Sequence, residues 1–512
     1  MLVKTFSSAV HGIEATSITV EVHISTGTKY YIVGLPDNAI KESWQRIESA
    51  IATIGFRMPR QKIVVNLAPA DIRKEGSAYD LSMAIGILAA SNQMSAHLLS
   101  DYLILGELSL DGDIQPIKGA LPVAIQAEKD GFKGVILPEL NAREAAAVQN
   151  LQVLPVNNLR EIVAFFNEEE KIEPLKIDIE NEFLHHINNY EVDFADVRGQ
   201  ENIKRALEIA AAGGHNVILI GPPGAGKTML AKRLPTILPP LTLSESLETT
   251  KIHSVAGQLH TQAALMTTRP FRAPHHTISD VALVGGGSYP QPGEISLAHN
   301  GVLFLDELPE FKRSVLEVMR QPLESRNITI SRARFSVDYP ASFMLIAAMN
   351  PCPCGYYNHP EKECICGSAV VQRYLSKISG PLLDRIDLHV EVTPVEFNEL
   401  AGKSSCEKSM SIRNRVMQAR MVQEQRFDHV DHIHCNAQMN SKAVRELCQI
   451  SEEGTLLLKR AMEKLGLSAR AYDRILKVAR TIADMDQCAA IENQHLAEAI
   501  HFRSLDRENW AG

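Results

Sequence analysis

The stretch of sequence that decides the fold reads Val217-Ile-Leu-Ile-Gly-Pro-Pro-Gly-Ala-Gly-Lys-Thr228. Its first four residues are apolar and predict a buried parallel strand, and a helical pattern follows Thr228. Glycines are needed between them because the backbone N–H groups must point inward at a phosphate, where a Cβ would obstruct them. The stretch predicts an α/β fold and a phosphate-binding loop made of Gly221, Pro222, Pro223, Gly224, Ala225, Gly226, Lys227 and Thr228.

Two side chains of this loop have predicted roles in binding ATP. Lys227 is expected to reach the β- and γ-phosphates, and Thr228 to bind Mg²⁺. The helix N-terminus adds a partial positive charge. A glycine-rich turn that matches by chance is the alternative, and the strand before the loop and the helix after it argue against that alternative.

A second apolar strand, Gly301-Val-Leu-Phe-Leu-Asp306-Glu307, ends in two carboxylates. Because such a strand lies close to the first, Asp306 is expected to hold Mg²⁺ through its water shell and Glu307 to polarise the attacking water. The alternative is an ordinary strand end with solvated acids. A third apolar strand, over residues 343–349, ends in Asn350, which is placed to orient the water.

The rest of the chain divides around this ATP-binding region. Every second residue from 18 to 24 is apolar, which is typical of a strand with one buried face, and further apolar runs alternate with helical patterns. Beyond residue 395 the apolar spacing is helical. We predict an α/β domain over residues 1–167, a charged linker over 168–192, an ATPase domain over 193–394 and a helical domain over 395–512.

The composition is that of a globular chain. Its 512 residues are 45% hydrophobic and 22% charged, which suits about three domains. The formal net charge of −9 argues against a uniformly basic surface, although a ring can confine positive charge to a channel that holds nucleic acid. The first residues lack a signal-peptide pattern, and no apolar run approaches the ~18 residues of a membrane span. We therefore expect a cytoplasmic protein that does not bind a membrane.

The order of the motifs resembles that of AAA+ ATPases. The resemblance extends to Gly380-Pro-Leu-Leu-Asp-Arg385-Ile-Asp387 and Leu467-Ser-Ala-Arg470. It implies that Arg385 is the arginine finger that reaches the γ-phosphate of a neighbouring subunit and that Arg470 is the second sensor. An arginine stabilises phosphate oxygens bidentately, and its supply in trans makes hydrolysis depend on ring assembly. The alternative for each is a surface arginine paired with an acid such as Asp384 or Asp473.

Within the AAA+ ATPases the chain resembles the magnesium-chelatase-like family. Phe271-Arg-Ala-Pro-His-His276 and Gly293-Glu-Ile-Ser-Leu-Ala-His-Asn300 carry this resemblance. True chelatase subunits work with a partner that has an adhesion motif of the type Asp-x-Ser-x-Ser, which is absent from this sequence. Chelation is therefore the less favoured activity.

The N-terminal block resembles the domain shared by Lon proteases and the recombination factor RadA. The motifs that carry this resemblance are Leu35-Pro-Asp37, Asn66-Leu-Ala-Pro-Ala-Asp71, Lys74-Glu-Gly-Ser-Ala-Tyr-Asp80 and Gly106-Glu-Leu-Ser-Leu-Asp-Gly-Asp113. Lon proteases use a serine whose base is a lysine. Ser77 stands near the serine position, but apolar Leu121 stands at the lysine position and Lys118 comes too early. We expect a Lon-like domain that is noncatalytic, a scaffold or binding platform.

Over nearly its whole length the chain resembles the ComM/YifB family of competence-associated AAA+ helicases. The resemblance implies a homo-hexameric ATPase that translocates on single-stranded and branched DNA. It further implies branch migration in homologous recombination during natural transformation, together with other recombination proteins. The alternative is a protein-remodelling or magnesium-chelatase-like chaperone, which would share the ATP site. A ring that threads polypeptide calls for an aromatic pore loop, and we find no clear candidate for one.

Two pairs of arginines are candidate DNA contacts. Residues 327–338 read as a hairpin before the third strand, and Arg332 and Arg334 lie two apart, on one face of an extended strand. In related replicative helicases a hairpin at this place lines the pore. Arg269 and Arg272 lie in a segment free of acids and form the second candidate pair. Solvated surface arginines are the alternative.

Four cysteines are concentrated between residues 352 and 366, directly after Asn350. Cys352, Cys354, Cys364 and Cys366 supply four soft ligands of the kind that suits tetrahedral Zn²⁺. Each pair has one residue between its cysteines, which is tighter than the usual two to four. We expect a zinc site, with free cysteines and a redox role as the alternatives.

Overall fold

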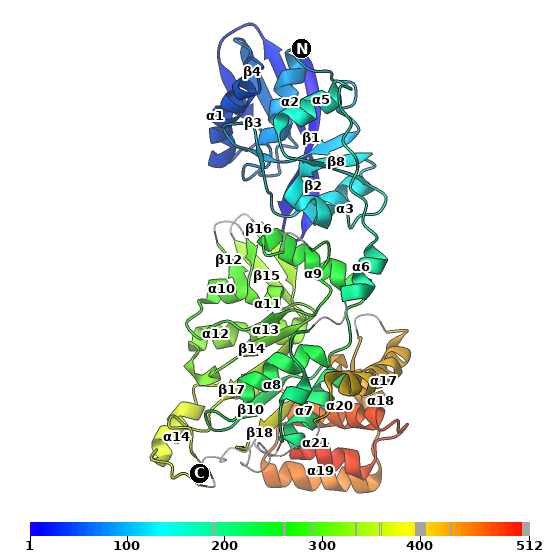
Figure 1. Cartoon of the computed structure of the whole chain (residues 1–512). Coiled ribbons are helices and arrows are strands. Elements are labelled where there is room, and N and C mark those ends of the chain that lie inside the picture. The colour runs from blue at the N-terminus through cyan, green and yellow to red at the C-terminus, as the bar shows by residue number, and fades with distance from the viewer. Residues whose placement is uncertain are drawn as a thin grey trace. The chain divides into compact units, whose positions relative to one another are not determined.

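The structure is a computed structural model that describes residues 1–186, 190–259, 263–287, 290–332, 335–357, 359, 361–394, 406–430 and 433–503. It divides into two compact units (Figure 1). Unit 1 comprises Met1–His186 and Thr242–Thr267, and unit 2 comprises Ile187–Leu241 and Thr268–Gly512. Both units are built on α/β sheets, so the fold class predicted from the sequence is confirmed.

Unit 1 is organised around a seven-stranded mixed sheet of order β3-β4-β2-β1-β5-β8-β9. The long strands β1 and β2 pair antiparallel, from Leu2 opposite His23 to His11 opposite Glu14. The alternating apolar residues of β2 are buried, as their period predicts. The strands of unit 1 are β1 (Leu2–His11), β2 (Glu14–Ser25), β3 (Tyr30–Val33), β4 (Lys62–Ala68), β5 (Tyr102–Ile104), β6 (Glu107–Leu108), β7 (Ile114–Gln115), β8 (Gly134–Pro138) and β9 (Gln152–Val156).

Helices cover this sheet, and α2 lies in the centre of the unit with every residue buried. A helix buried all round carries apolar residues on all its faces, which explains why Ser82 is the one polar side chain between Asp80 and the end of α2. The helices of unit 1 are α1 (Asn38–Thr53), α2 (Asp80–Ala90), α3 (Ala120–Lys129), α4 (Glu139–Ala145), α5 (Leu159–Phe166), α6 (Ile179–His186) and α9 (Leu243–Ala256).

Helix α9 belongs to unit 1 although it lies within the ATPase segment of the sequence. A capping box between Thr242 and Glu245 starts the helix, and Gly257 ends it in the left-handed conformation. The backbone N–H of Gly119, at the start of α3, donates to the Ser254 carbonyl over 3.2 Å. Leu265 joins the same apolar core as α3 and α4. The chain therefore leaves the ATPase segment, packs on unit 1 and returns.

The segment after α5 also packs on unit 1. Its backbone joins the edge of the sheet, where the Leu175 N–H donates to the Val153 carbonyl over 2.9 Å. In α6, Ile179 is buried and Glu182 pairs with Arg143 at 3.0 Å. Residues up to 186 are thus tied to the N-terminal core.

Unit 2 contains a five-stranded parallel sheet of order β11-β14-β17-β10-β18. Its inner strands are uniformly apolar because helices cover both faces. The strands are β10 (Val217–Ile220), β11 (Phe271–Arg272), β14 (Val302–Leu305), β17 (Met344–Met349) and β18 (Leu388–Glu391). Two hairpins stand apart from the sheet, β12 (Gly285–Gly286) with β13 (Gln291–Pro292), and β15 (Asn327–Arg332) with β16 (Phe335–Pro340).

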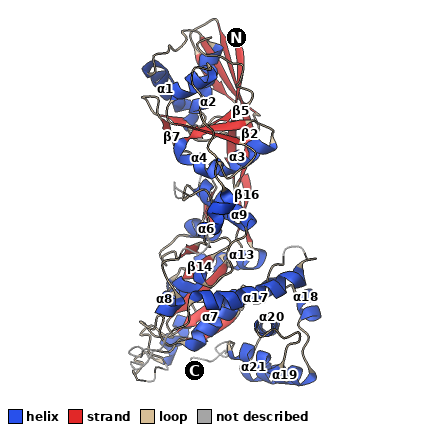
Figure 2. Cartoon of the chain, turned by 45° about the vertical axis from the view of Figure 1, so that its right-hand side comes forward, coloured by secondary structure: helices blue, strands red, loops and turns tan. Residues whose placement is uncertain are grey.

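The C-terminal helices share one apolar core with the parallel sheet. Helices α17 and α20 both pack on α7, as Figure 2 shows. Gln423 on α17 donates to the Ala212 carbonyl at the end of α7 over 3.0 Å. The helices of unit 2 are α7 (Glu201–Gly213), α8 (Lys227–Arg233), α10 (Asp280–Val284), α11 (Glu294–Leu297), α12 (Arg313–Val318), α13 (Arg320–Ser325), α14 (Ser368–Leu375), α15 (Gly380–Leu383), α17 (Ser409–Phe427), α18 (Ser441–Leu447), α19 (Glu452–Leu465), α20 (Ala469–Met485) and α21 (Asn493–His501).

Candidate active site

The phosphate loop predicted from the sequence follows the carboxyl end of β10. This strand pairs with β17 on one side and β18 on the other, and all four of its side chains are buried. Gly224 and Gly226 have φ values of +77° and +86°, which side chains other than glycine rarely adopt. Gly226 is also the cap residue of α8. The loop therefore lies where open α/β sheets bind their ligands, outside the carboxyl ends of the strands.

Lys227 is held inside the loop by three acceptors. Its Nζ donates to the carbonyls of Gly221 and Pro222 over 2.7 and 2.9 Å and to Asn350 Oδ1 over 3.1 Å. The residue is only 8% exposed, and burial lowers the pKa of its ammonium. The contact with Asn350 joins the phosphate loop to the end of the third strand, so these two predicted site residues lie together.

Thr228 and Asp306 meet at the carboxyl ends of β10 and β14, which lie on either side of β17 in the sheet. The Thr228 hydroxyl donates to Asp306 Oδ2 over 2.7 Å, and the other carboxylate oxygen accepts the Glu307 N–H over 3.0 Å. Oxygen ligands of this kind are those that Mg²⁺ prefers. The residues present therefore fit a magnesium ion held between the hydroxyl and the carboxylate.

Glu307 has a backbone conformation that is uncommon for a glutamate. Its φ is +51°, in the left-handed region, and its side chain is 58% exposed. Strain of this kind concentrates at functional sites, where the surrounding structure holds it. The Glu307 carboxylate faces His276, with 3.4 Å between Oε2 and Nδ1. No role for His276 was predicted from the sequence, although a segment that follows β11 emerges at the same sheet edge as one that follows the parallel strand β14.

A cavity of about 400 Å³ brings these groups together. It is lined by the phosphate loop, by Asp306 and Glu307 and by Asn350. The volume and the lysine, hydroxyl and carboxylate groups suit a polyphosphate with its metal ion. The arrangement can therefore bind a nucleoside triphosphate and polarise a water molecule beside it.

A second cavity, of about 450 Å³, lies on the other side of the phosphate loop. Its walls are residues 196–200 and 222–226 together with Tyr356, Lys362 and their neighbours from the loop of the cysteine cluster. Gln200 is one of its lining residues, and the Gln200 amide donates to the Ala225 carbonyl over 2.9 Å. Apart from the phosphate loop itself, these lining residues carried no signal in the sequence, since only the fold brings them to the phosphate loop.

Arg385 and Arg470 lie away from the two cavities, among whose described lining residues neither occurs. Arg385 follows α15, is 6% exposed and pairs with Glu324 at 2.5 Å. Arg470, near the start of α20, is 60% exposed and lies 3.9 Å from Asp384. Asp384 is one of the two acids named above as alternative surface partners for these arginines. The two arginines are thus neighbours on one part of unit 2, through the consecutive residues Asp384 and Arg385.

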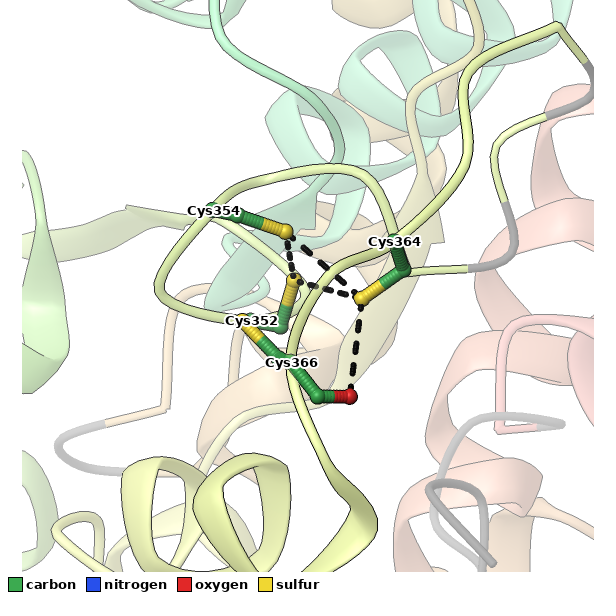
Figure 3. A group of neighbouring side chains, drawn as sticks. All are labelled: Cys352, Cys354, Cys364 and Cys366. Carbon is green, nitrogen blue, oxygen red and sulfur yellow. Dashed lines mark hydrogen bonds between the residues drawn. The ribbon is translucent and has the colours of Figure 1, made fainter.

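The four clustered cysteines converge, as Figure 3 shows. All four Sγ atoms lie within 4.8 Å of one another. The separations are 3.3 Å between Cys352 and Cys354, 3.7 Å between Cys352 and Cys364, and 3.6 Å between Cys354 and Cys364. Four thiolates placed tetrahedrally around a zinc ion at ~2.3 Å would lie ~3.8 Å apart. The cluster therefore has the spacing of a metal site.

The candidate DNA-binding arginines differ in how much the structure describes. Arg332 ends β15, whose partner strand β16 confirms the predicted hairpin. Its side chain and the whole of Arg334 lie outside the described residues. The hairpin register runs from Asn327 opposite Pro340 to Arg332 opposite Phe335, so Arg332 is the last paired residue of β15.

Arg269 and Arg272 are engaged within unit 2. Arg269 donates to the carbonyls of Pro239, Pro240 and Asn300 over 2.6, 3.2 and 2.7 Å. Arg272 makes a bidentate pair with Glu294, two bonds of 2.7 Å each. Although no acid lies near them in the sequence, both arginines have hydrogen-bond partners in the folded chain, because these partners come from distant segments.

The Lon-like part of unit 1 has its candidate residues in different settings. Ser77 donates to the carboxylate of Glu107. Leu121, at the position of the Lon lysine, is fully buried in an apolar core. Lys118 lies beside Gly257 instead. The described arrangement at Ser77 thus supplies a carboxylate in place of a lysine base.

Among the described residues, no helix has both the length and the apolar character needed to cross a membrane.

Comparison with known families covers most of the chain. The family described as "Magnesium chelatase, subunit ChlI" matches residues 193–400. "Subunit ChlI of Mg-chelatase" matches residues 20–141, and "Magnesium chelatase, subunit ChlI C-terminal" matches residues 406–503. The first match contains the phosphate loop, Asp306 and Glu307, so the geometric site lies within the family's ATPase region.

Individual relatives extend this likeness over the full length. The chain is 43% identical over 509 residues to the competence protein ComM of Haemophilus influenzae, covering 99% of this chain and 98% of the relative. It is 45% identical over 500 residues to YifB of Escherichia coli, covering 97% and 96%. A partial match of 31% identity over 189 residues joins it to Lon protease 2 of Bacillus subtilis, 31% of this chain and 33% of the protease. The chain belongs to the ComM/YifB family of magnesium-chelatase-like AAA+ ATPases.

Proposed function

We propose that the chain is an ATP-driven DNA translocase that works as a homo-hexamer and promotes branch migration in homologous recombination during natural transformation. The observation that carries the proposal is the pairing of a complete hydrolytic site with an arginine that stands outside it. Lys227, Asp306 and Glu307 line one cavity. Arg385 is not one of the described residues that line it. The printed name of the ComM relative, a competence protein, supports the DNA-related role.

In the hydrolytic site each residue has a distinct task. Lys227 exchanges contacts with its own loop for contacts with the phosphates, and its burial makes that charge interaction strong. Thr228 and Asp306 would hold Mg²⁺, which neutralises phosphate charge when bound. Glu307 accepts the proton of the attacking water, and Asn350 orients that water.

The position of Arg385 favours a ring. An arginine finger stabilises the transferring phosphoryl group of a neighbouring subunit, so it must stand away from its own nucleotide. Arg385 and Arg470 are neighbours through Asp384. We therefore assign Arg385 to the face that meets the next subunit, where it acts on the γ-phosphate, and we assign Arg470 the role of the second sensor.

The hairpin β15–β16 is the proposed DNA grip. Arg332 is the last paired residue of β15, and Arg334 follows two residues later in the sequence. Phosphate contacts from arginines hold DNA without reading its sequence. Arg269 and Arg272 already form hydrogen bonds with Pro239, Pro240 and Glu294. The hairpin is therefore the preferred candidate for the DNA contact.

We assign Zn²⁺ to the cysteine cluster. The Sγ separations suit tetrahedral thiolate ligation, and the loop has little apolar core of its own beyond Cys352 and Val371. A bound ion would hold this loop in place between Asn350 and the segment that leads to Arg385.

The competing function is a protein-remodelling or magnesium-chelatase-like chaperone. It shares the ATP site with the proposed translocase. The partial match to a magnesium-chelatase 38 kDa subunit, at 24% identity over 177 residues, supports this alternative.

The experiment that separates the two functions is the ATPase rate of the pure protein with and without single-stranded, duplex and branched DNA. Stimulation by branched DNA, together with movement of a synthetic branch point that requires ATP, supports the translocase. A rate that no DNA changes, but that a protein substrate raises, would support the chaperone.

A further inference from the structure

The loop of the cysteine cluster packs directly against the phosphate loop. It begins after Asn350 and contains Gly355, whose φ is +85°. A Cβ on Gly355 would lie 2.5 Å from Cδ of Pro223 in the phosphate loop. Both the backbone conformation and the close approach therefore require glycine here, and the two loops are in contact.

Beyond Gly355 this loop forms a wall of the cavity of about 450 Å³. Tyr356 and Lys362 line it, together with His359 and Glu361. Lys362 Nζ lies 4.9 Å from the centre of the Tyr356 ring, and the His359 ring stands edge-on to the same ring at 5.5 Å. An aromatic ring flanked by polar groups is suited to stack on and hydrogen-bond a nucleobase.

The phosphate site accounts for the phosphates of a nucleotide but not for its ribose and base, and this cavity is placed to receive these two groups. Residues 222–226 of the phosphate loop line it, together with Asp196, Val197, Arg198 and Gln200. A nucleotide whose phosphates contact Lys227 would extend its ribose and base past Pro223 into this space. The volume lies within the range of small-molecule sites, roughly 300–1,000 Å³.

The cysteines bracket this wall. Cys354 stands two residues before Tyr356, and Cys364 stands two residues after Lys362. Helix α14 begins only at Ser368, so the described part of the loop between β17 and α14 has no helix or strand to hold it. A metal ion bound by Cys352, Cys354, Cys364 and Cys366 would fix both ends of the wall at once.

We propose that the metal-bound cysteine loop is the base-binding wall of the nucleotide site, with Tyr356 stacking on the base and Lys362 positioning it. This inference rests on the proposal that the chain binds ATP, and it adds a metal requirement for nucleotide affinity. Binding at the two sites is reciprocal, because a metal that favours nucleotide binding is itself favoured by the nucleotide.

The first test is the affinity of Tyr356→Ala and Lys362→Ala for two probes, Mg-ADP by calorimetry and inorganic tripolyphosphate by competition. We expect Tyr356→Ala to weaken Mg-ADP binding by about tenfold, since stacking on a base is lost. Tripolyphosphate should bind both variants as it binds the unchanged protein, because it has no base. Glu363→Ala is the matched control: Glu363 is an exposed residue of the same loop and is not among the described residues that line the cavity.

The second test is metal removal from the unchanged full-length protein with a phenanthroline chelator, which leaves Mg²⁺ in place. Mg-ADP affinity should fall and return when Zn²⁺ is restored, while tripolyphosphate affinity stays constant. Equal weakening of both probes by either treatment would overturn the proposal, since the loop would then only support the phosphate loop. Unchanged Mg-ADP affinity would overturn it as well. Both readouts measure binding, so they are independent of whether DNA stimulates turnover.

Discussion

Arg385 and Glu324 form an ion pair within one subunit, with 2.5 Å between guanidinium Nη2 and carboxylate Oε1. Arg385 is buried and Glu324 is 55% exposed on its side chain, so the pair has one open side. Nε of Arg385 has no hydrogen-bond partner among the described residues. We propose that the guanidinium exchanges the exposed Glu324 carboxylate for the phosphate of a neighbouring subunit.

Arg385→Ala is therefore expected to lower the ATPase rate by about a thousandfold or more, and Arg385→Lys should not restore it because lysine lacks the bidentate fork. The decisive measurement mixes Arg385→Ala with Lys227→Ala, each inactive alone. Mixed rings should regain activity, since an intact phosphate loop in one subunit meets an intact arginine from the other. No recovery in rings shown to contain both variants would place Arg385 in its own subunit's site.

Lys227 and Glu307 should affect different steps. Lys227→Ala removes a buried charge from the phosphates and is expected to weaken ATP binding by roughly 10-fold to 100-fold. Glu307→Gln keeps the shape of the site but loses the base, so it should bind ATP and hydrolyse it about a hundredfold more slowly. Binding and single-turnover hydrolysis, measured separately, check this division. A glutamine variant that retains a rate near that of the unchanged protein would remove Glu307 from the mechanism.

The cysteine cluster is expected to hold about one zinc ion per chain, since four thiolates complete a tetrahedral site. Elemental analysis of protein purified without chelators is the measurement. Replacing Cys352 and Cys364 with serine should abolish the bound metal, whereas Cys488→Ser, outside the cluster, should not. A metal content well below half an equivalent in the unchanged protein would favour free or redox-active cysteines.

Arg332 and Arg334 should contribute to the salt dependence of DNA binding. Each phosphate contact releases counterions, so replacing both with alanine is expected to make the slope of log affinity against log salt shallower by about two. Branch migration should fall as well. Arg313→Ala, an exposed arginine at the start of α12, is the control. If the double variant keeps both the slope and branch migration, the DNA grip lies elsewhere, and Arg269 with Arg272 would be tested next.

In unit 1, the buried carboxylate of Asp80 depends on Arg46. The pair is bidentate at 2.6 and 3.1 Å, and burial raises the pKa of Asp80 from 3.8 to about 6 although Arg46 opposes the shift. Because the folded-state pKa is raised, the contribution of Asp80 to stability is fully present below about pH 4 and is lost as the pH rises through 6. Arg46→Ala removes the opposing charge and should destabilise unit 1 by about 3–5 kcal/mol.

This loss should be larger at pH 8 than at pH 5, where more of the carboxyl is protonated. Urea unfolding followed by the fluorescence of Trp44, in a Trp510→Phe background, reports the unit that contains the pair. Arg57→Ala on the same unit provides a surface control, since the described side-chain ion pairs do not include it. If Arg46→Ala lowered the free energy of unfolding by the same amount at both pH values, Asp80 would have to stay in one protonation state throughout.

The sequence predicted the strand, loop and carboxylates of the ATP site because each is a local pattern. The parallel pairing of β14 and β10 with β17 then brings Thr228 to Asp306 and Lys227 to Asn350. The alternating residues of β2 and the hairpin of residues 327–338 were predictable for the same reason. Local periodicity is sufficient where the partner is a neighbouring strand.

Contacts between distant segments were not predictable. His276 approaches Glu307, and Tyr356 lines the cavity beside Pro223, only because the sheet edge gathers their loops. The acid-free surroundings of Arg272 in the sequence conceal its partner Glu294, which arrives from α11. A capping box at Thr242 and Glu245 marks the start of α9 in the sequence, but nothing local shows that its partner is α3.

Because α9 packs on unit 1, this unit is built from two separate segments of the sequence. A chain shortened to begin near residue 190 would keep α9 while deleting the surface that covers Leu247 and Leu265, and would expose apolar side chains to solvent. The base of the excursion is closed by Arg269, which grips the carbonyls of Pro239 and Pro240. A recombinant motor fragment is therefore better made by also excising residues 242–267 and bridging the gap with a short glycine linker.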